Sequence, residues 1–241
     1  MQSVRRAPQA AAPPAHVAII MDGNRRWAAR HSLPPIEGHR RGAEVLREIA
    51  GAAADAGIAY LTVFAFSDEN WRRESGEVSA LMELVRSFAR AQARDLRNRD
   101  VRVRLLGRRD RLPALTLGAL DELERGTAAC RGLQLNLAID YGARAELCDA
   151  IRALAADVAS GRVAASSVDE NVVARYLYTA GMPDPDFVIR TGGELRVSNF
   201  LLYQIAYAEL WSTPACWPEF DRAAFQSALD AFSTRQRRFG R

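Results

Sequence analysis

The sequence predicts an α/β fold, with a single domain built on a central, mostly parallel six-stranded sheet that is flanked by helices. Short apolar runs of strand length alternate with longer amphipathic segments along the 241 residues, which is typical of parallel strands joined by helical crossovers. Several apolar runs end abruptly in polar clusters, as strands do at the ligand-binding edge of an open sheet. Neither an internal repeat nor a linker interrupts the pattern, so we expect one domain with a sizeable core.

The predicted elements follow in a regular order. Continuous apolar runs indicate buried parallel strands at residues 17–21, 60–66, 101–106, 133–139, 187–189 and 206–211. Helical spacing of apolar side chains is found at residues 38–56, 78–97, 112–123, 145–158, 168–178 and 221–239. Pro34 and Pro35 are expected to break the chain before the first of these helices. Residues 1–15, rich in Ala and Pro, are interpreted as a disordered leader without the apolar core of a signal peptide, which leaves 16–241 as the domain.

The composition excludes several function classes. All 33 basic residues are arginine, so the chain has no P-loop lysine, no Schiff-base lysine and no lysine general base. Phosphate binding would depend on arginine, whose planar guanidinium binds phosphate oxygens in a bidentate way. The net charge of +4 suits an anionic substrate, and no nucleic-acid-binding module is present. The 3 scattered cysteines indicate buried thiols in a reducing cytoplasm, and no apolar run reaches the ~20 residues of a membrane span.

Four polar clusters follow predicted strands, at residues 22–26, 67–73, 140–142 and 190–198. Because the carboxyl ends of parallel strands share one edge of a sheet, we expect the clusters to meet. Asp22 supplies a carboxylate, Gly23 allows a ligand to approach, and the donors after it begin a helix whose N-terminus favours anions. One carboxylate beside several anion donors predicts a phosphorylated substrate handled with a metal ion. Residues 140–142 are interpreted mainly as a strand-to-helix turn, and a capping Asp, a glycine turn and solvated arginines are the alternative for the other clusters.

Several separated segments carry a resemblance to a known family, at residues 16–27, 38–39, 65–71, 77–84, 135–142, 188–209 and 237–240. They include Met-Asp-Gly-Asn-Arg-Arg-Trp after the first strand and Phe-Ser-Asp-Glu-Asn-Trp after the second. In the content and order of these segments, the chain resembles the cis-prenyltransferases, the undecaprenyl diphosphate synthase family, over nearly all of its length after residue 15. The resemblance implies a cis-prenyltransferase domain with an apolar tunnel for a growing chain. It also implies a homodimer, Mg²⁺, and adjacent sites for isopentenyl diphosphate and an allylic diphosphate.

The resemblance implies a role for each matching residue. Asp22 is expected to be the catalytic aspartate that binds Mg²⁺, and Asn70 to assist proton removal. The allylic diphosphate is expected to contact Gly23, Asn24, Arg25, Arg26, Trp27, His39 and Arg73. The next substrate-binding segment comprises Ser67, Asp68, Glu69, Asn70 and Trp71, and isopentenyl diphosphate is expected at Arg190, Arg196, Val197 and Ser198. Glu209 matches an acidic residue linked to metal binding near the dimer contact, although a plain sheet-edge charge is the alternative.

A few positions depart from the family pattern. Arg25 stands where many bacterial members have glycine, and Pro35 where an arginine that contacts the allylic diphosphate is often found. Leu195 stands where some members have a metal-associated histidine, which weakens the expected metal role of Glu209. Ile139 is bulky for the tunnel wall and would shorten the product. Small residues at positions 85 and 87, Val and Ser, would instead widen the tunnel, so the sequence predicts no product length.

The implied activity is Mg²⁺-dependent (Z)-prenyl diphosphate synthesis from isopentenyl diphosphate and a dimethylallyl, geranyl or farnesyl diphosphate. One alternative is an irregular synthase that joins two allylic diphosphates head-to-middle into a branched, lavandulyl-type product, which Pro35 would allow. A non-catalytic partner subunit of a heteromeric prenyltransferase should lack Asp22 or residues 190–198, and a nucleotide-binding module should carry Gly-x-Gly-x-x-Gly. This chain fits neither description. We expect a cytoplasmic protein that contacts a membrane peripherally, through its product.

Overall fold

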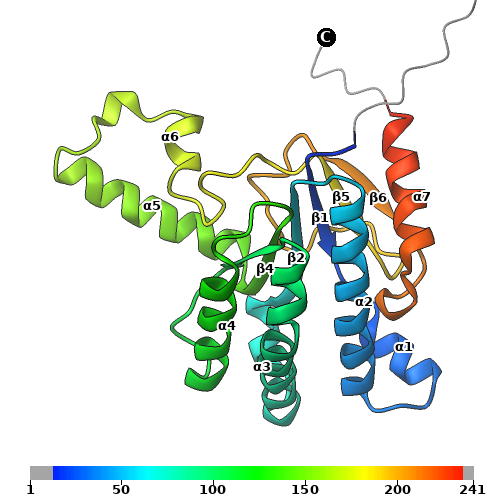
Figure 1. Ribbon diagram of the computed structural model, residues 1–241. Coiled ribbons are helices and arrows are strands. Elements are labelled where there is room, and N and C mark those ends of the chain that lie inside the picture. The colour runs from blue at the N-terminus through cyan, green and yellow to red at the C-terminus, as the bar shows by residue number, and fades with distance from the viewer. Residues whose placement is uncertain (1–12, 236–241) are drawn as a thin grey trace, which may run out of the picture.

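The computed structural model describes residues 13–235 and contains one six-stranded sheet (Figure 1). Its strands are β1 His16–Ile20, β2 Tyr60–Ser67, β3 Arg102–Leu106, β4 Gln134–Tyr141, β5 Phe187–Arg190 and β6 Glu209–Ser212. They lie in the order β3-β4-β2-β1-β5-β6, and each neighbouring pair is parallel. The α/β prediction is therefore confirmed, with a sheet that is wholly parallel in the described residues. The predicted leader, apart from residues 13–15, and the segment 237–240 lie outside that range.

The connections between the strands are mainly helical. In residues 13–235 the helices are α1 Asn24–Arg30, α2 Pro35–Asp55, α3 Ser75–Asn98, α4 Ala114–Thr127, α5 Ala143–Ala159, α6 Glu170–Ala174 and α7 Arg222–Ser233. Three short 3-10 segments are η1 Asp68–Arg72, η2 Ala165–Ser167 and η3 Trp217–Glu219. None of the helices in this range is both long and apolar enough to cross a bilayer.

Several observed helices have other boundaries than predicted. The predicted break is present between α1 and α2, where Pro34 is not helical, but α2 begins at Pro35 and not at Gly38 as predicted. Proline suits the first helical position, where its missing N–H has no partner to lose and its fixed φ is helical. The helix predicted over 168–178 is reduced to α6, since the Tyr178 N–H donates to the Glu146 carboxylate (2.8 Å) and not to a helical carbonyl. The terminal helix ends at Ser233, and residues 236–239 of its prediction lie outside the described part.

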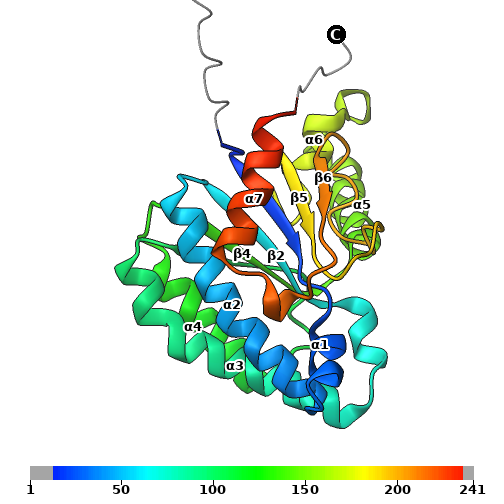
Figure 2. The same cartoon turned by 90° about the vertical axis from the view of Figure 1, so that its right-hand side faces the viewer.

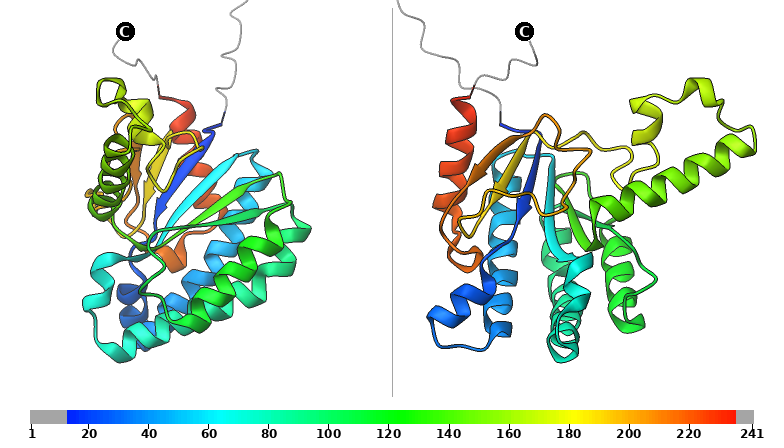
Figure 3. Two further views of the ribbon diagram at one scale, coloured as in Figure 1. Left: turned by 90° about the vertical axis from the view of Figure 1, so that its left-hand side faces the viewer. Right: turned by 180° about the vertical axis from the view of Figure 1, so that it is seen from behind.

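The sheet separates two apolar cores. Alternate side chains of β1 point to opposite faces, so Val17 and Ile19 pack in the larger core while Ala18 and Ile20 pack in the smaller one. Helices α2, α3, α4 and α7 cover the face of the larger core (Figure 2). The smaller core includes the start of α5, and the rest of α5 with α6 forms an arm that projects away from the sheet (Figures 1 and 3). The wide helical layer on one face encloses the cavity of the candidate site.

Candidate active site

The four polar clusters lie at one edge of the sheet. Strands β4, β2, β1 and β5 are consecutive neighbours, and their parallel registers bring Ser67 opposite Tyr141 and Arg190 opposite Ile20. Asp22 follows β1 at the same edge. The prediction that these clusters meet is therefore confirmed, and the edge lies next to α1 (Figure 1).

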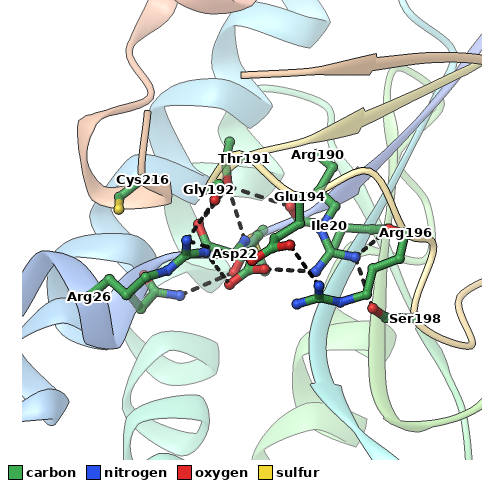
Figure 4. Close-up of polar contacts among 12 residues, drawn as sticks. Ile20, Asp22, Arg26, Arg190, Thr191, Gly192, Glu194, Arg196, Ser198 and Cys216 are labelled. Carbon is green, nitrogen blue, oxygen red and sulfur yellow. Dashed lines mark hydrogen bonds and ion pairs between the residues drawn. The ribbon is translucent and has the colours of Figure 1, made fainter. Parts of the chain in front are cut away.

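The turn at Asp22 is held by its neighbours on both sides. The Thr191 hydroxyl donates to the Asp22 carbonyl (2.7 Å) and accepts from the Asp22 N–H (3.0 Å), as Figure 4 shows. Gly23 then adopts φ 104° as the residue before α1, and a Cβ there would lie 2.7 Å from the Cys216 sulfur. Glycine is required at this position by both the backbone conformation and the lack of space. Thr191 was not singled out from the sequence, although it directly follows Arg190.

The Asp22 carboxylate lies between two guanidinium groups. Arg190 Nη2 donates to Oδ2 (2.7 Å), and Arg26 Nη2 lies 3.2 Å from Oδ1. Burial alone would raise the pKa of Asp22, but the hydrogen bond and charge of Arg190 and the charge of Arg26 outweigh it and hold the pKa below its usual range. Asp22 is therefore ionised at neutral pH, at a place with an excess of positive charge.

Arg190 organises the segment that follows β5. Its side chain is 8% exposed, and its guanidinium donates to the Ser198 hydroxyl (2.8 Å) and to the Arg196 carbonyl. Gly192 and Gly193 have positive φ angles, which let the chain turn back toward α1. Arg26 Nη1 donates to the Gly192 carbonyl (2.7 Å). The structure thus joins the Asp22 turn to the predicted anion-binding segment (Figure 4).

Only some side chains of residues 67–73, the segment after β2, face this edge of the sheet. The Asn70 side chain accepts from the Ser67 N–H (3.1 Å), closing a capping box, and Arg73 pairs with Glu77 (2.9 Å). Asp68, Glu69 and Trp71 instead bind neighbouring segments, through Arg111, Asn199 and Asp140 respectively. Neither Arg111 nor Asp140 was predicted as a site residue, since each acquires its partners only through the fold.

A cavity of about 240 Å³ begins at the polar edge and extends between the sheet and α2 and α3. Its polar lining residues are Asp22, Asn24, His39, Ser67, Asn70, Arg73 and Ser198. Its apolar lining residues include Leu46, Phe66, Leu81, Leu84, Val85, Phe88, Leu120, Leu137 and Ile139. The cavity therefore has a mouth lined by charged and polar side chains and an interior lined by apolar side chains. Ile139 and Val85 line it as expected, whereas Ser87 is exposed and bonded to Glu83, so the expectation that Ser87 widens it is wrong.

Three buried polar atoms at this edge have no hydrogen-bond partner among the described residues: Asn24 Oδ1, His39 Nε2 and Arg190 Nε. Burial and the nearby Arg73 charge lower the pKa of His39 to about 4, so its imidazole is neutral at pH 7. An unpaired buried polar atom costs about 1–3 kcal/mol. Asn24 and His39 line the mouth of this cavity, and Arg190 lines a second, smaller one, so a polar ligand at this edge would complete their bonding.

The remaining predicted site residues do not line this cavity. Arg25 is exposed, 3.9 Å from Glu77, and Trp27 packs on His31 with ring centroids 4.3 Å apart. Arg196 and Val197 line a smaller cavity together with residues of β5 and β6, and the Arg196 guanidinium pairs with Glu194 (2.6 Å). Glu209 begins β6, opposite Phe187, and pairs with Arg235 (2.8 Å). Within one chain, Glu209 and Asp22 therefore lie toward opposite ends of the strands.

Asp22 is the one carboxylate among the residues that line this cavity. The described residues include no group of three or more His, Cys, Asp or Glu side chains that could hold a metal ion. Mg²⁺ does not require such a group, because it is commonly bound by one or two carboxylates together with substrate phosphates and water. Asp22 and the unpaired Asn24 oxygen fit that kind of binding.

Fold and site together define a class of protein: a parallel α/β protein with a charged strand edge that opens into an apolar cavity. The sequence profile of the family described as undecaprenyl diphosphate synthase matches residues 20–240. The isoprenyl transferase of Agrobacterium fabrum is 50% identical over 227 residues, which cover 94% of this chain and 92% of that protein. The isoprenyl transferase of Rhodopirellula baltica is 47% identical over 94% of this chain and 93% of its own.

Solved structures agree with the sequence relatives. The lavandulyl diphosphate synthase of Lavandula x intermedia, solved with dimethylallyl diphosphate, superposes with a TM-score of 0.93 at 35% identity, covering 95% of this chain and 99% of that one. A structure from Campylobacter jejuni described as an undecaprenyl diphosphate synthase gives a TM-score of 0.78 at 29% identity, with the same coverage. The chain belongs to the undecaprenyl diphosphate synthase family and is a prenyltransferase.

Proposed function

We propose that this prenyltransferase is a Mg²⁺-dependent (Z)-prenyl diphosphate synthase, which condenses isopentenyl diphosphate with an allylic prenyl diphosphate and releases diphosphate. The observation that carries the proposal is the cavity itself. Its mouth joins Asp22 to unpaired polar atoms, and its body is lined by aliphatic and aromatic side chains. A substrate that fits both parts has an anionic head and a branched hydrocarbon chain.

The allylic diphosphate is assigned to the Asp22 side of the mouth. There the start of α1 supplies backbone N–H groups and its positive dipole end, beside Arg26 and Arg73. Neutral His39 can donate one hydrogen bond from its ring to a diphosphate oxygen. These donors stabilise the negative charge that grows on the leaving diphosphate as the allylic C–O bond breaks.

Isopentenyl diphosphate is assigned to the segment after β5. Arg190, Arg196 and Ser198 would hold its diphosphate, so that its double bond faces the allylic carbon in the cavity. The new C–C bond forms from that double bond to the allylic carbon, diphosphate leaves, and a proton is then lost to give a Z double bond. Asn70 lines the cavity, and we assign it the role of assisting that proton loss.

Mg²⁺ would be held by Asp22 together with the substrate's phosphate oxygens. When bound, it supplies positive charge that stabilises the departing diphosphate. A metal role for Glu209 would require a second chain, since Glu209 and Asp22 are separated within one chain.

We also propose that the protein is a cytoplasmic homodimer that contacts membranes peripherally, through its product. Strand β6 is an edge strand, and the large apolar side chains of Leu195, Tyr207 and Leu210 are exposed beside it. Exposed apolar groups around an unpaired strand edge favour association with a second copy.

A second candidate function is the irregular coupling of two allylic diphosphates into a branched, lavandulyl-type product. The similarity to the lavandulyl diphosphate synthase structure favours it, as does Pro35 at a position where arginine is expected. The full isopentenyl diphosphate segment and Asn70 favour the regular reaction instead.

A product assay distinguishes the two. The purified protein is incubated with Mg²⁺ and labelled isopentenyl diphosphate, together with dimethylallyl, geranyl or farnesyl diphosphate, and the products are sized and analysed for double-bond geometry. A linear Z-prenyl chain supports the proposal. A branched product from allylic diphosphate alone, without incorporation of isopentenyl diphosphate, would favour the second candidate, and a product with only E double bonds would contradict both.

A further inference from the structure

Asp140 is a buried carboxylate at the candidate site that the reaction does not use. It lies in β4 with φ 51°, a left-handed conformation that Asp and Asn tolerate better than most residues. Its side chain is 0% exposed. It accepts hydrogen bonds from Trp71 Nε1 (2.7 Å), from Arg111 Nε (3.0 Å) and from Arg111 Nη2. A fully buried carboxylate requires such pairing, because an unpaired charge there is strongly unfavourable.

The loop after β3 positions Arg111 beside the Asp140 carboxylate. Gly107 has φ 122°, and a Cβ there would lie 2.1 Å from the Ile139 carbonyl oxygen, so the loop crosses directly against the end of β4. Arg111 then binds Asp140 and also Asp68. Its guanidinium carbon lies 5.6 Å from the centre of the Trp71 ring. One cation therefore links β4 to two residues of η1.

The η1 segment has few other attachments. None of its five residues is buried, and its other contacts include the Glu69 bond to Asn199 (3.1 Å) and the packing of Trp71 on Phe66. Segments with few buried contacts open at low free-energy cost. Asn70 and Arg73, which line the cavity mouth, are carried by this segment and by the residue after it.

We propose that Asp140 and Arg111 form a clasp that holds η1 in the position where Asn70 and Arg73 face the cavity. Both are positioning residues, because they act through Trp71 and Asp68 and do not line the cavity. The inference deepens the proposed function, on which the roles of Asn70 and Arg73 rest. Releasing the clasp would loosen the allylic side of the mouth and leave the Arg190 side in place.

The clasp is tested by hydrogen exchange on the full chain, which needs no turnover. Asp140→Asn keeps an acceptor for Trp71 and a residue suited to positive φ, but it removes the charge that binds Arg111. The matched control is Asp121→Asn, which removes the exposed carboxylate paired with Arg109 of the same loop (2.6 Å). We expect amide exchange over residues 67–73 to accelerate about tenfold in Asp140→Asn and to be unchanged in the control.

Arg111→Gln, with Arg109→Gln as its control, provides a second test if the buried substitution prevents folding. The double variant at positions 140 and 111 should show less than the summed effect, since both substitutions remove the same link. Unchanged exchange over residues 67–73 in both Asp140→Asn and Arg111→Gln would overturn the clasp, as would fully additive effects.

Kinetics separate positioning from a general loss of stability. In Asp140→Asn we expect the KM for the allylic diphosphate to rise about tenfold, while the KM for isopentenyl diphosphate stays within twofold. Equal rises in both constants would contradict the proposal, because a clasp on η1 affects one side of the mouth. If the wild-type chain makes no prenyl product, the proposed function fails, but the exchange comparison still decides whether the clasp exists.

Discussion

At the scale of single residues, the chemistry depends on charges held in fixed places. Asp22 remains ionised because Arg190 and Arg26 outweigh its burial, and Thr191 fixes the backbone that carries it. His39 shows the opposite balance: burial and a neighbouring cation keep it neutral. In the proposed reaction the two groups would meet a diphosphate in different ways, Asp22 through Mg²⁺ and His39 as a hydrogen-bond donor.

Replacing Asp22 tests the carboxylate directly. We expect Asp22→Ala to lower kcat on the order of 10²–10³-fold, as the loss of one electrostatic stabiliser does, with prenyl product formation as the measurement. Circular dichroism should show an unchanged fold, since Arg190 keeps its bonds to Ser198 and the Arg196 carbonyl. Near-normal turnover in this variant would contradict the mechanism.

The lowered pKa of His39 predicts a pH dependence of stability. The unfolded chain takes up a proton near pH 6.5 and the folded chain only near pH 4, so this residue reduces stability as the pH falls through that window. His39→Gln removes the effect. The unfolding free energy of the variant minus that of wild type should be about 2 kcal/mol larger at pH 5 than at pH 7. Urea titrations at both pH values measure it, and a difference independent of pH would show that His39 is not held neutral.

At the scale of elements, the helices of the larger core determine the shape of the cavity. One side of α3 supplies Leu81, Leu84, Val85 and Phe88 to the cavity, while its other side is exposed to solvent. Opposite α3, β4 contributes Ile139. The depth available to a hydrocarbon chain therefore depends on a few side chains whose size can be changed without touching the polar mouth.

Product length should respond to those side chains. Val85→Phe reduces the space beside α3, and we expect products shorter by about one isoprene unit or more, because a packed interior leaves no room to compensate. Ile139→Ala should lengthen them. Ser87→Phe is the matched control, since Ser87 lies on the same helix but is exposed. Chromatographic sizing of the products measures the effect, and an equal shift in the Ser87 variant would show that the cavity does not hold the chain.

At the scale of the whole molecule, the two edges of the sheet differ. The β3 edge is bordered by α4, whereas β6 ends the sheet with exposed apolar side chains nearby. The proposed dimer uses the β6 edge, which would also bring a second copy toward Glu209. The projecting arm of α5 and α6 lies on the side of the smaller core (Figure 3).

A charge placed at the β6 edge tests this assembly. Tyr207 is 79% exposed, and we expect Tyr207→Glu to raise the dimer dissociation constant at least tenfold, because a buried interface does not tolerate an unpaired charge. Leu115→Glu, at a 64% exposed position on α4, serves as the control. Sedimentation velocity over a concentration series gives the result, and equal dimerisation of both variants would place the interface elsewhere.

Local patterns in the sequence determined the fold class and the location of the candidate site. The alternation of apolar runs and amphipathic segments predicted the parallel sheet, since burial on both faces requires continuous apolar strands. Polar residues at strand ends predicted the site, because parallel strands end at one edge. Several helix boundaries differ from the prediction: for example, α2 begins at Pro35, and beyond α6 the Tyr178 N–H donates to Glu146 and not to a helical carbonyl.

Only the tertiary structure decided which charges meet. Asp22 and Arg190 are 168 positions apart in the chain, and the Asp140 that appeared to be a simple turn residue is joined to Arg111 and Trp71. By contrast, helical periodicity alone separates Val85 from Ser87, because residues two positions apart lie on opposite sides of a helix. The physical reason is that periodicity reports which residues are buried, whereas partners in a hydrogen bond or an ion pair depend on distances that arise only when separate elements pack together.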